Sequence, residues 1–151
     1  MTMTSNALRK SVTHAFIARG FSPIDRVLFR TGDGVTMVVG FDRGFEHQWY
    51  ISIGFWLHGL GAEVPSVVEK THLYFRLDRL VPQLREVVLM AGSLADKRQP
   101  EALGQLIDLI SSDVGTMLES LLTIEGLTAA LKAHALDSGL VTKEARAYLT
   151  G

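Results

Sequence analysis

The sequence contains no cysteine among its 151 residues. Disulfide bonds, thiolate catalysis and cysteine-ligated zinc are therefore excluded, and the composition suits a reducing compartment. No run of about 18 apolar residues is free of charge, and residues 1–12 lack the apolar core of a signal peptide. We therefore predict a cytoplasmic protein that has no membrane partner.

An excess of charge of one sign is also absent. The 15 basic and 16 acidic side chains leave a net charge of −1, so no overall field attracts nucleic acid or an anionic surface. Nucleic acid is accordingly not expected as a partner. With 151 residues, 47% of them hydrophobic, the chain can bury one core without disulfides or metals. We predict a single domain over residues 1–151.

The sequence motifs of common catalytic sites are missing as well. A phosphate-binding loop, a dinucleotide-binding glycine pattern, a nucleophile elbow and a paired-histidine zinc motif do not occur. Of five histidines, only His58 and His72 are expected on one face of a sheet, and no dense carboxylate cluster accompanies them. We predict no catalytic residue, no cofactor and no metal; enzymatic activity stays open, although these absences weigh against it.

A predicted β-hairpin between Gly34 and Leu60 is the strongest positive signal. Apolar side chains alternate with polar or small ones along both of its arms, as in strands with one buried face. The polar connection at residues 42–47 is longer than a two-residue turn. Burying each apolar side chain is worth about 1.5–3 kcal/mol, so the pairing register is fixed. The side chains expected to face the core are Val35, Met37, Val39, Phe41, Trp49, Ile51, Ile53, Phe55 and Leu57.

Two further strands complete the predicted sheet. Residues 25–30 form the first strand, with Val27 and Phe29 facing the core, and residues 71–78 form the fourth. Residues 61–70 have no clear period and are expected to form a loop, with a possible helical turn after Pro65. The inward side chains of the fourth strand are Leu73, Phe75 and Leu77.

The remaining segments have helical periodicity. A first helix, capped by Thr4 or Ser5, ends at Gly20, and a long helix runs from Pro100 to Leu122. Shorter helices are expected at residues 82–91, 127–136 and 142–148. The first and the long helix would cover one face of the sheet. The predicted fold is therefore α+β: an antiparallel four-stranded meander sheet, with an N-terminal helix and C-terminal helices packed on one face.

The opposite face of the sheet carries charges, so it must be wet or covered by a partner. Arg76 and Asp78 lie two residues apart on this face; a structural ion pair is the favoured interpretation, and a charged ligand held by Arg76 is the alternative. The expected residues of this face are Arg26, Leu28, Arg30, Thr36, Val38, Tyr50, Ser52, Trp56, His72, Tyr74 and Arg76.

Five of these side chains form our candidate binding site: Tyr50, Trp56, His72, Tyr74 and Arg76. Aromatic rings beside an arginine can stack a ligand or dock a partner protein. The alternative, held equally open, is that the loop at residues 61–70 folds over them.

The order of features resembles an uncharacterised bacterial family, the domain of unknown function 4304. The similarity spans about Asn6 to Leu80, and the polar glutamine often found near the end of the family's second strand is replaced by Phe41-Asp42. The resemblance implies a bacterial α+β domain without established activity, and it transfers no catalytic residue. The stretches that carry it are Arg19-Gly20-Phe21, Phe29-Arg30, residues 38–41, residues 50–54 and residues 69–77.

Two classes of function are compatible with these features. The first is a non-enzymatic binding or protein-interaction module, such as a toxin-neutralising immunity protein. The alternative is a small-molecule-binding domain or small enzyme, with a pocket between the open sheet face and the loop at residues 61–70. A homodimer would form if a second copy buried Leu28, Val38 and Trp56.

Overall fold

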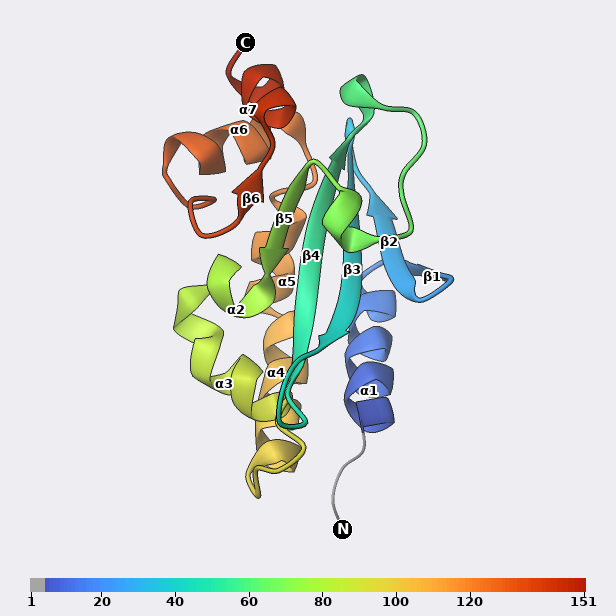
Figure 1. Cartoon of the computed structure of the whole chain (residues 1–151), viewed down its shortest axis with the longest axis vertical. Coiled ribbons are helices and arrows are strands. Elements are labelled where there is room, and N and C mark those ends of the chain that lie inside the picture. The colour runs from blue at the N-terminus through green and yellow to red at the C-terminus, as the bar shows by residue number, and fades with distance from the viewer. Residues whose placement is uncertain (1–4) are drawn as a thin grey trace.

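The computed structural model describes the chain from Ser5 to Gly151, with side chains from Ala7 onward. The predicted cap of the first helix at Thr4 or Ser5 lies outside the described side chains. The sheet has six strands in chain order, each antiparallel to its neighbours (Figure 1). The strands are β1 (Ser22–Ile24), β2 (Val27–Thr31), β3 (Val35–Arg43), β4 (Trp49–Leu57), β5 (Leu73–Arg76) and β6 (Leu140–Val141).

The predicted α+β meander is confirmed, but the prediction of four strands is wrong. Strands β1 and β6 extend the sheet at its two edges, where they pair with β2 and β5. At three and two residues they are too short to show a period-two pattern. Strand β5 is also shorter than expected, because Leu77 to Leu80 form a helical turn, α2.

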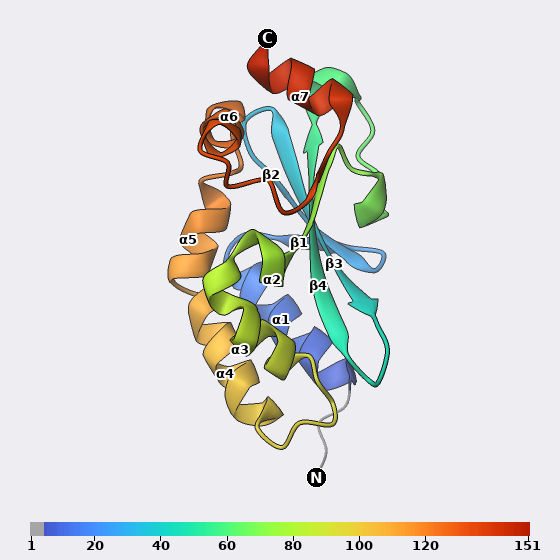
Figure 2. The same ribbon diagram turned by 60° about the vertical axis from the view of Figure 1, so that its left-hand side comes forward.

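Helices cover one face of the sheet, as expected from the apolar stripes (Figure 2). Helix α1 lies against α4, and α3 also packs on α4. Within the described part of the chain, no helix is both long and apolar enough to cross a membrane. The helices are α1 (Ser5–Ala18), α2 (Leu77–Leu80), α3 (Arg85–Ala91), α4 (Gln99–Ile110), α5 (Asp113–Glu119), α6 (Ile124–Lys132) and α7 (Lys143–Thr150); short 3₁₀ helices lie at His58–Leu60, Val68–Lys70 and Pro82–Leu84.

The core between the sheet and the helices contains most of the predicted inward side chains. Of the nine expected from the β3–β4 hairpin, only Phe41 and Trp49 are partly exposed. The three predicted core residues of β5 and the turn after it, and the four of α1, are also buried: Leu73, Phe75, Leu77, Leu8, Val12, Ala15 and Phe16. Gly20 ends the first helical segment in a left-handed conformation, with φ +93°.

The predicted facing of β2 is wrong. Leu28 pairs with Val39 and enters the main core, so Val27 and Phe29 lie on the opposite face. Arg30 pairs with Met37 and therefore also lies on the helix side. All three residues at 27–29 are apolar, so the sequence alone does not show which of them faces the helices.

The predicted long helix is interrupted at Ser111 and Ser112, between α4 and α5. The hydroxyl of Ser112 donates to the carbonyl of Asp108 at 2.7 Å, and the freed carbonyl of Ser111 accepts a hydrogen bond from Arg19 at 3.0 Å. Both helices keep their apolar sides on the core, so the periodicity continues across the break. Side-chain hydrogen bonds to backbone carbonyls do not change the spacing of apolar residues. The hydrophobic pattern therefore does not reveal this break.

Residues 61–71, which we call the strap, cross the face of the sheet that the helices leave uncovered (Figure 1). Val68 of the strap is buried with Val27 and Val38. A side chain at Gly40 would place its Cβ 2.6 Å from Val68 Cγ2, so this glycine permits the close approach. Of the two alternatives for this face, the loop therefore does fold over its centre.

Candidate functional site

The five predicted site residues all lie on the strap side of the sheet, but they form separate clusters. Trp56 and His72 lie at one end, beside the first residues of the strap. Tyr50 and Arg76 lie toward the β3–β4 turn, and Tyr74 lies between the two pairs, in contact with the cluster around Val68. The structure therefore does not bring these five side chains into a single patch.

Trp56 and His72 hold the strap against the sheet. Their rings stack with centroids 3.9 Å apart, and the Trp56 indole N–H donates to the carbonyl of Gly61 at 2.8 Å. The backbone N–H of Leu57 donates to His72 Nδ1 at 2.9 Å. This bond requires a neutral imidazole with its proton on Nε2. Burial lowers the pKa of His72, although Glu144 opposes the shift.

Arg76 forms the predicted ion pair with Asp78. Its Nε and Nη2 donate to the two carboxylate oxygens at 3.1 and 2.6 Å, and the Asp78 side chain is fully buried. The guanidinium carbon also lies 4.1 Å from the ring centroid of Tyr50. Hydrogen bonding to Asp78 raises the pKa of Arg76. Both oxygens of the buried Asp78 carboxylate thus accept hydrogen bonds from Arg76, which favours the structural interpretation.

Tyr74 belongs to a half-buried polar cluster with Asp42 and Ser52. The Ser52 hydroxyl donates to the Asp42 carboxylate, and the Tyr74 hydroxyl lies 3.5 Å from both side chains. Burial raises the pKa of Tyr74, so its hydroxyl stays protonated. Ser52 has no exposed surface and therefore cannot reach a substrate as a nucleophile.

The most exposed aromatic side chain is one that the sequence analysis assigned only to a polar connection. Phe45, at the tip of the β3–β4 hairpin, is 93% exposed. It opens a turn in which Gln48 N–H donates back to the Phe45 carbonyl at 3.1 Å. Glu46 and His47 fill the two central positions with φ of 55° and 62°, as a type I′ turn requires. The sequence signal that could have indicated this exposed side chain is an aromatic residue inside an otherwise polar turn.

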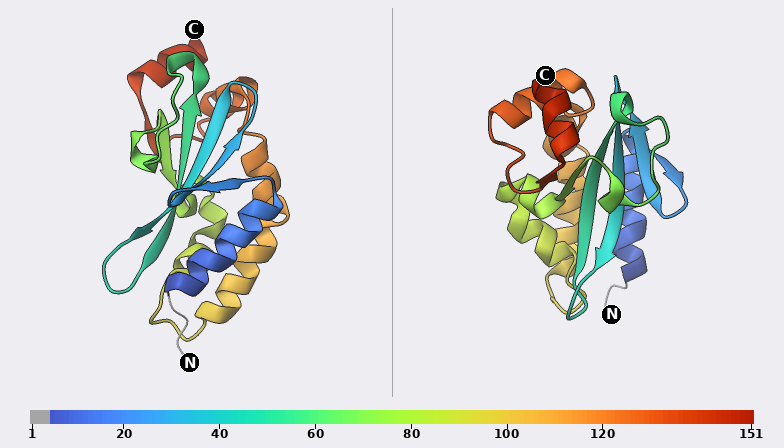
Figure 3. Two further views of the ribbon diagram at one scale, coloured as in Figure 1. Left: turned by 90° about the vertical axis from the view of Figure 1, so that its right-hand side faces the viewer. Right: turned by 45° about the horizontal axis from the view of Figure 1, so that its top comes forward.

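Several hydrogen bonds anchor this hairpin tip, which we define as residues 44–48. The backbone N–H of Gly44 donates to Gln48 O at 2.7 Å, and Leu94 N–H donates to His47 O at 3.1 Å. The Gln48 side chain donates to Leu89 O at 2.9 Å. The tip is therefore fixed to α3 and to the segment that follows it, while the end of the hairpin stands out from the helix layer (Figure 3, left).

Among residues 5–151, no group of three His, Asp or Glu side chains lies close enough together to hold an ion. His58, one of the two histidines expected on this face, is instead hydrogen-bonded to Thr36 at 2.7 Å.

We expect the Arg76→Ala variant to lose about 3 kcal/mol of unfolding free energy, the lower end of the range for breaking a buried ion pair, because Asp78 would remain buried without its partner. Arg98→Ala is the matched control. It removes an arginine that is 66% exposed from an ion pair with Asp96, whose side chain is 23% exposed, and should change stability little because both charges stay in contact with water. Urea unfolding of both variants measures the difference. Equal stability of the two variants would contradict the structural role of Arg76.

Protonation of His72 should release its bond to the Leu57 N–H. Because the pKa of His72 is lowered in the fold, the neutral ring stabilises the protein fully above pH 6.5, and this contribution is lost as the pH falls through the folded-state pKa. We expect an NMR titration of the His72 ring to give a midpoint below 6.5. We also expect the acid-induced loss of stability to be smaller in His72→Asn. A midpoint at or above the ordinary value would refute this assignment.

Comparison of the chain with protein-family models, with curated proteins and with solved structures finds no match in any of the three. The resemblance to the domain of unknown function 4304 therefore stays a prediction, and it rests on the sequence stretches between Asn6 and Leu80.

Proposed function

We propose that the protein is a non-enzymatic protein-interaction module that binds its partner through the hairpin tip. The observation that carries this proposal is the 93% exposure of Phe45 on an anchored turn. Single exposed apolar residues are common on protein surfaces. Phe45 differs because two consecutive non-glycine residues beside it, Glu46 and His47, adopt left-handed conformations, and strain of this kind is concentrated at functional positions.

The chemistry of the tip suits a protein partner. Aromatic residues, phenylalanine among them, are enriched in protein interfaces, and the side chains that dominate binding occupy well-packed pockets of the partner. Because hydrogen bonds already fix the turn, little conformational entropy would be lost on binding. Arg43, Glu46 and His47 are exposed around Phe45, so a partner with an apolar pocket and a polar rim of mixed charge would be complementary.

The partly exposed pair of Tyr50 and Arg76 would extend this surface along the sheet. The Tyr50 ring covers Gly44, where a Cβ would lie 2.5 Å from Tyr50 Cε2, so the tip and this pair adjoin. A toxin-neutralising immunity protein is one form that such a module takes, since it acts by occupying a partner's surface. A bacterial origin and a cytoplasmic location belong to the same proposal.

Two earlier alternatives have less support. Val68 fills the centre of the sheet face, so the small-molecule pocket expected under the strap is reduced to a hollow of about 340 Å³ at the strap's edge, beside Gly40, Asp42 and Val68. A homodimer stays a prediction, but Leu28 and Val38, which we expected at its interface, are buried within the chain. Of that set only Trp56 is partly exposed.

We expect Phe45→Ala to weaken binding of the partner at least about tenfold, the effect typical of a dominant interface residue. Leu140→Ala is the matched control, because it truncates another strongly exposed apolar side chain, 71% exposed, on β6. Both variants should unfold like the wild type. Quantitative affinity capture from the source cells, followed by calorimetry with the captured protein, measures the effect.

Equal affinity of the wild type and Phe45→Ala for the captured protein would show that the hairpin tip is not the binding surface. Capture of no protein above the level of a blank matrix would also count against the proposal, since an interaction module requires a partner.

A further inference from the structure

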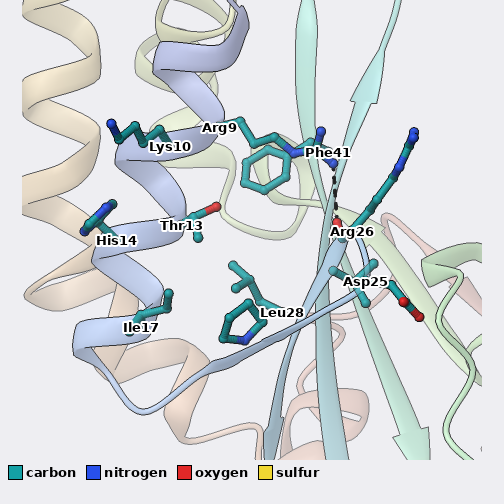
Figure 4. Close-up of a pocket in the computed structure, with 11 residues that line it drawn as sticks. Arg9, Lys10, Thr13, His14, Ile17, Asp25, Arg26, Leu28 and Phe41 are labelled. Atoms are coloured by element: carbon teal, nitrogen blue, oxygen red, sulfur yellow. Dashed lines mark hydrogen bonds between the residues drawn. The ribbon is translucent and has the colours of Figure 1, made fainter.

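A separate hollow, which shares no residue with the hairpin tip, lies between α1 and the β1–β2 turn (Figure 4). We call it the α1 hollow. Its volume is about 360 Å³, near the lower end of the range of about 300–1,000 Å³ that is typical of small-molecule sites. The residues that matter for its chemistry are Arg9, Thr13, Ile17, Arg26, Leu28 and Phe41.

The inner wall of the α1 hollow is mostly apolar. Leu28 and the partly buried Phe41 belong to the edge of the main core, and Ile17 is 41% exposed beside them. Figure 4 shows the hydroxyl of Thr13 among these side chains, where it can donate or accept a hydrogen bond. A ligand with an apolar body would cover this wall.

The rim of the hollow is basic. Within the described residues, no ion pair joins Arg9, Lys10 or Arg26 to a carboxylate. The Arg9 guanidinium lies 5.6 Å from the Phe41 ring centroid, and its one hydrogen bond, to the Arg26 carbonyl, is long at 3.4 Å. Asp25 is the acidic residue of the lining. Figure 4 shows the side chains of Asp25, Arg26 and Lys10 directed away from the apolar wall at Leu28, whereas that of Arg9 reaches toward Phe41.

We infer that the α1 hollow binds a small organic anion with an apolar body. The anionic group, a carboxylate, sulfonate or phosphate, would accept charge-assisted hydrogen bonds from Arg9, and from Arg26 after rotation of its side chain toward the hollow. The apolar part would pack on Ile17, Leu28 and Phe41. This site is independent of the proposed hairpin-tip interaction, because the two surfaces share no residue.

Two other hollows are less suited to an anion. One of about 340 Å³ adjoins the α1 hollow across Arg9 and Arg26, but its lining includes the acidic Asp42 and Glu69. The other, of about 410 Å³, lies between α2, α5 and α6 and is lined by uncharged side chains, among them Leu121 and Ala130. The second of these should accept neutral apolar molecules, so it provides an internal control.

Anilinonaphthalene sulfonate is a suitable probe, because it joins an aromatic body to an anion and fluoresces when it leaves water. We expect it to bind the wild type and to bind the double variant Arg9→Gln/Arg26→Gln at least about tenfold more weakly, because two charged donors are lost. The matched control is Lys132→Gln/Arg146→Gln, which removes two exposed charges elsewhere and should leave the affinity unchanged. Circular dichroism would verify that each variant is folded.

Two further measurements separate charge recognition from nonspecific apolar binding. N-phenylnaphthylamine, the same ring system without the sulfonate, should bind both double variants as it binds the wild type. Ala130→Trp, which fills the hollow between α5 and α6, should leave the affinity for the sulfonate unchanged. The inference is overturned if the sulfonate does not bind, if both double variants lose affinity equally, or if Ala130→Trp abolishes sulfonate binding.

Discussion

The pairing of β3 with β4 is the constraint on which the rest of the structure depends. Nine residue pairs, from Val35 opposite Leu57 to Arg43 opposite Trp49, set which side chains face the helices and which face the strap. A slip of one residue would move the buried set to the other face. The same register brings Gly40 and Ser52 opposite each other, and Gly40 leaves the space that Val68 of the strap occupies.

A second connection fastens the helix layer to this sheet. Glu119, in the last turn of α5, accepts hydrogen bonds from both Arg19, after α1, and Arg30, in β2. These two arginines hold the pKa of Glu119 below its ordinary value, so the carboxylate stays ionised. Arg19 also donates to the carbonyl of Ser111, which is free because the helix is interrupted there. The break between α4 and α5 thus gives the end of α1 a place to bind.

Much of the fold could be predicted because alternating burial gives a strong signal. The β3–β4 hairpin, the buried side of α1 and the cap of α7 by Thr142, whose hydroxyl accepts from Ala145 N–H at 3.1 Å, follow from local sequence. The facing of β2 does not, since residues 27–29 are all apolar and only pairing with β3 decides it. The edge strands β1 and β6 are recognised only by their pairing with β2 and β5, because they are too short to show a pattern of their own.

The surface features were harder to predict, because most of them depend on contacts between separate segments of the chain. The ion pair of Arg76 with Asp78 was foreseeable because its members are neighbours in sequence. The α1 hollow forms between segments that the sequence analysis treated as separate elements. The exposure of Phe45 depends on a turn whose left-handed residues are Glu46 and His47 and not the nearby glycine, so the usual sequence signal for such a turn is absent.

The central claim is that the face of the sheet opposite the helices is closed over its middle by the strap and presents Phe45 at the end of the hairpin. NMR relaxation of side-chain protons by a neutral, soluble paramagnetic agent tests this most directly. We expect weak relaxation of the methyl groups of Val38 and Val68, which are 0% and 4% exposed, and strong relaxation of the Phe45 ring, which is 93% exposed. Relaxation of the Val38 methyl groups as strong as that of the Phe45 ring would mean that the strap does not cover the sheet, and the account would be wrong.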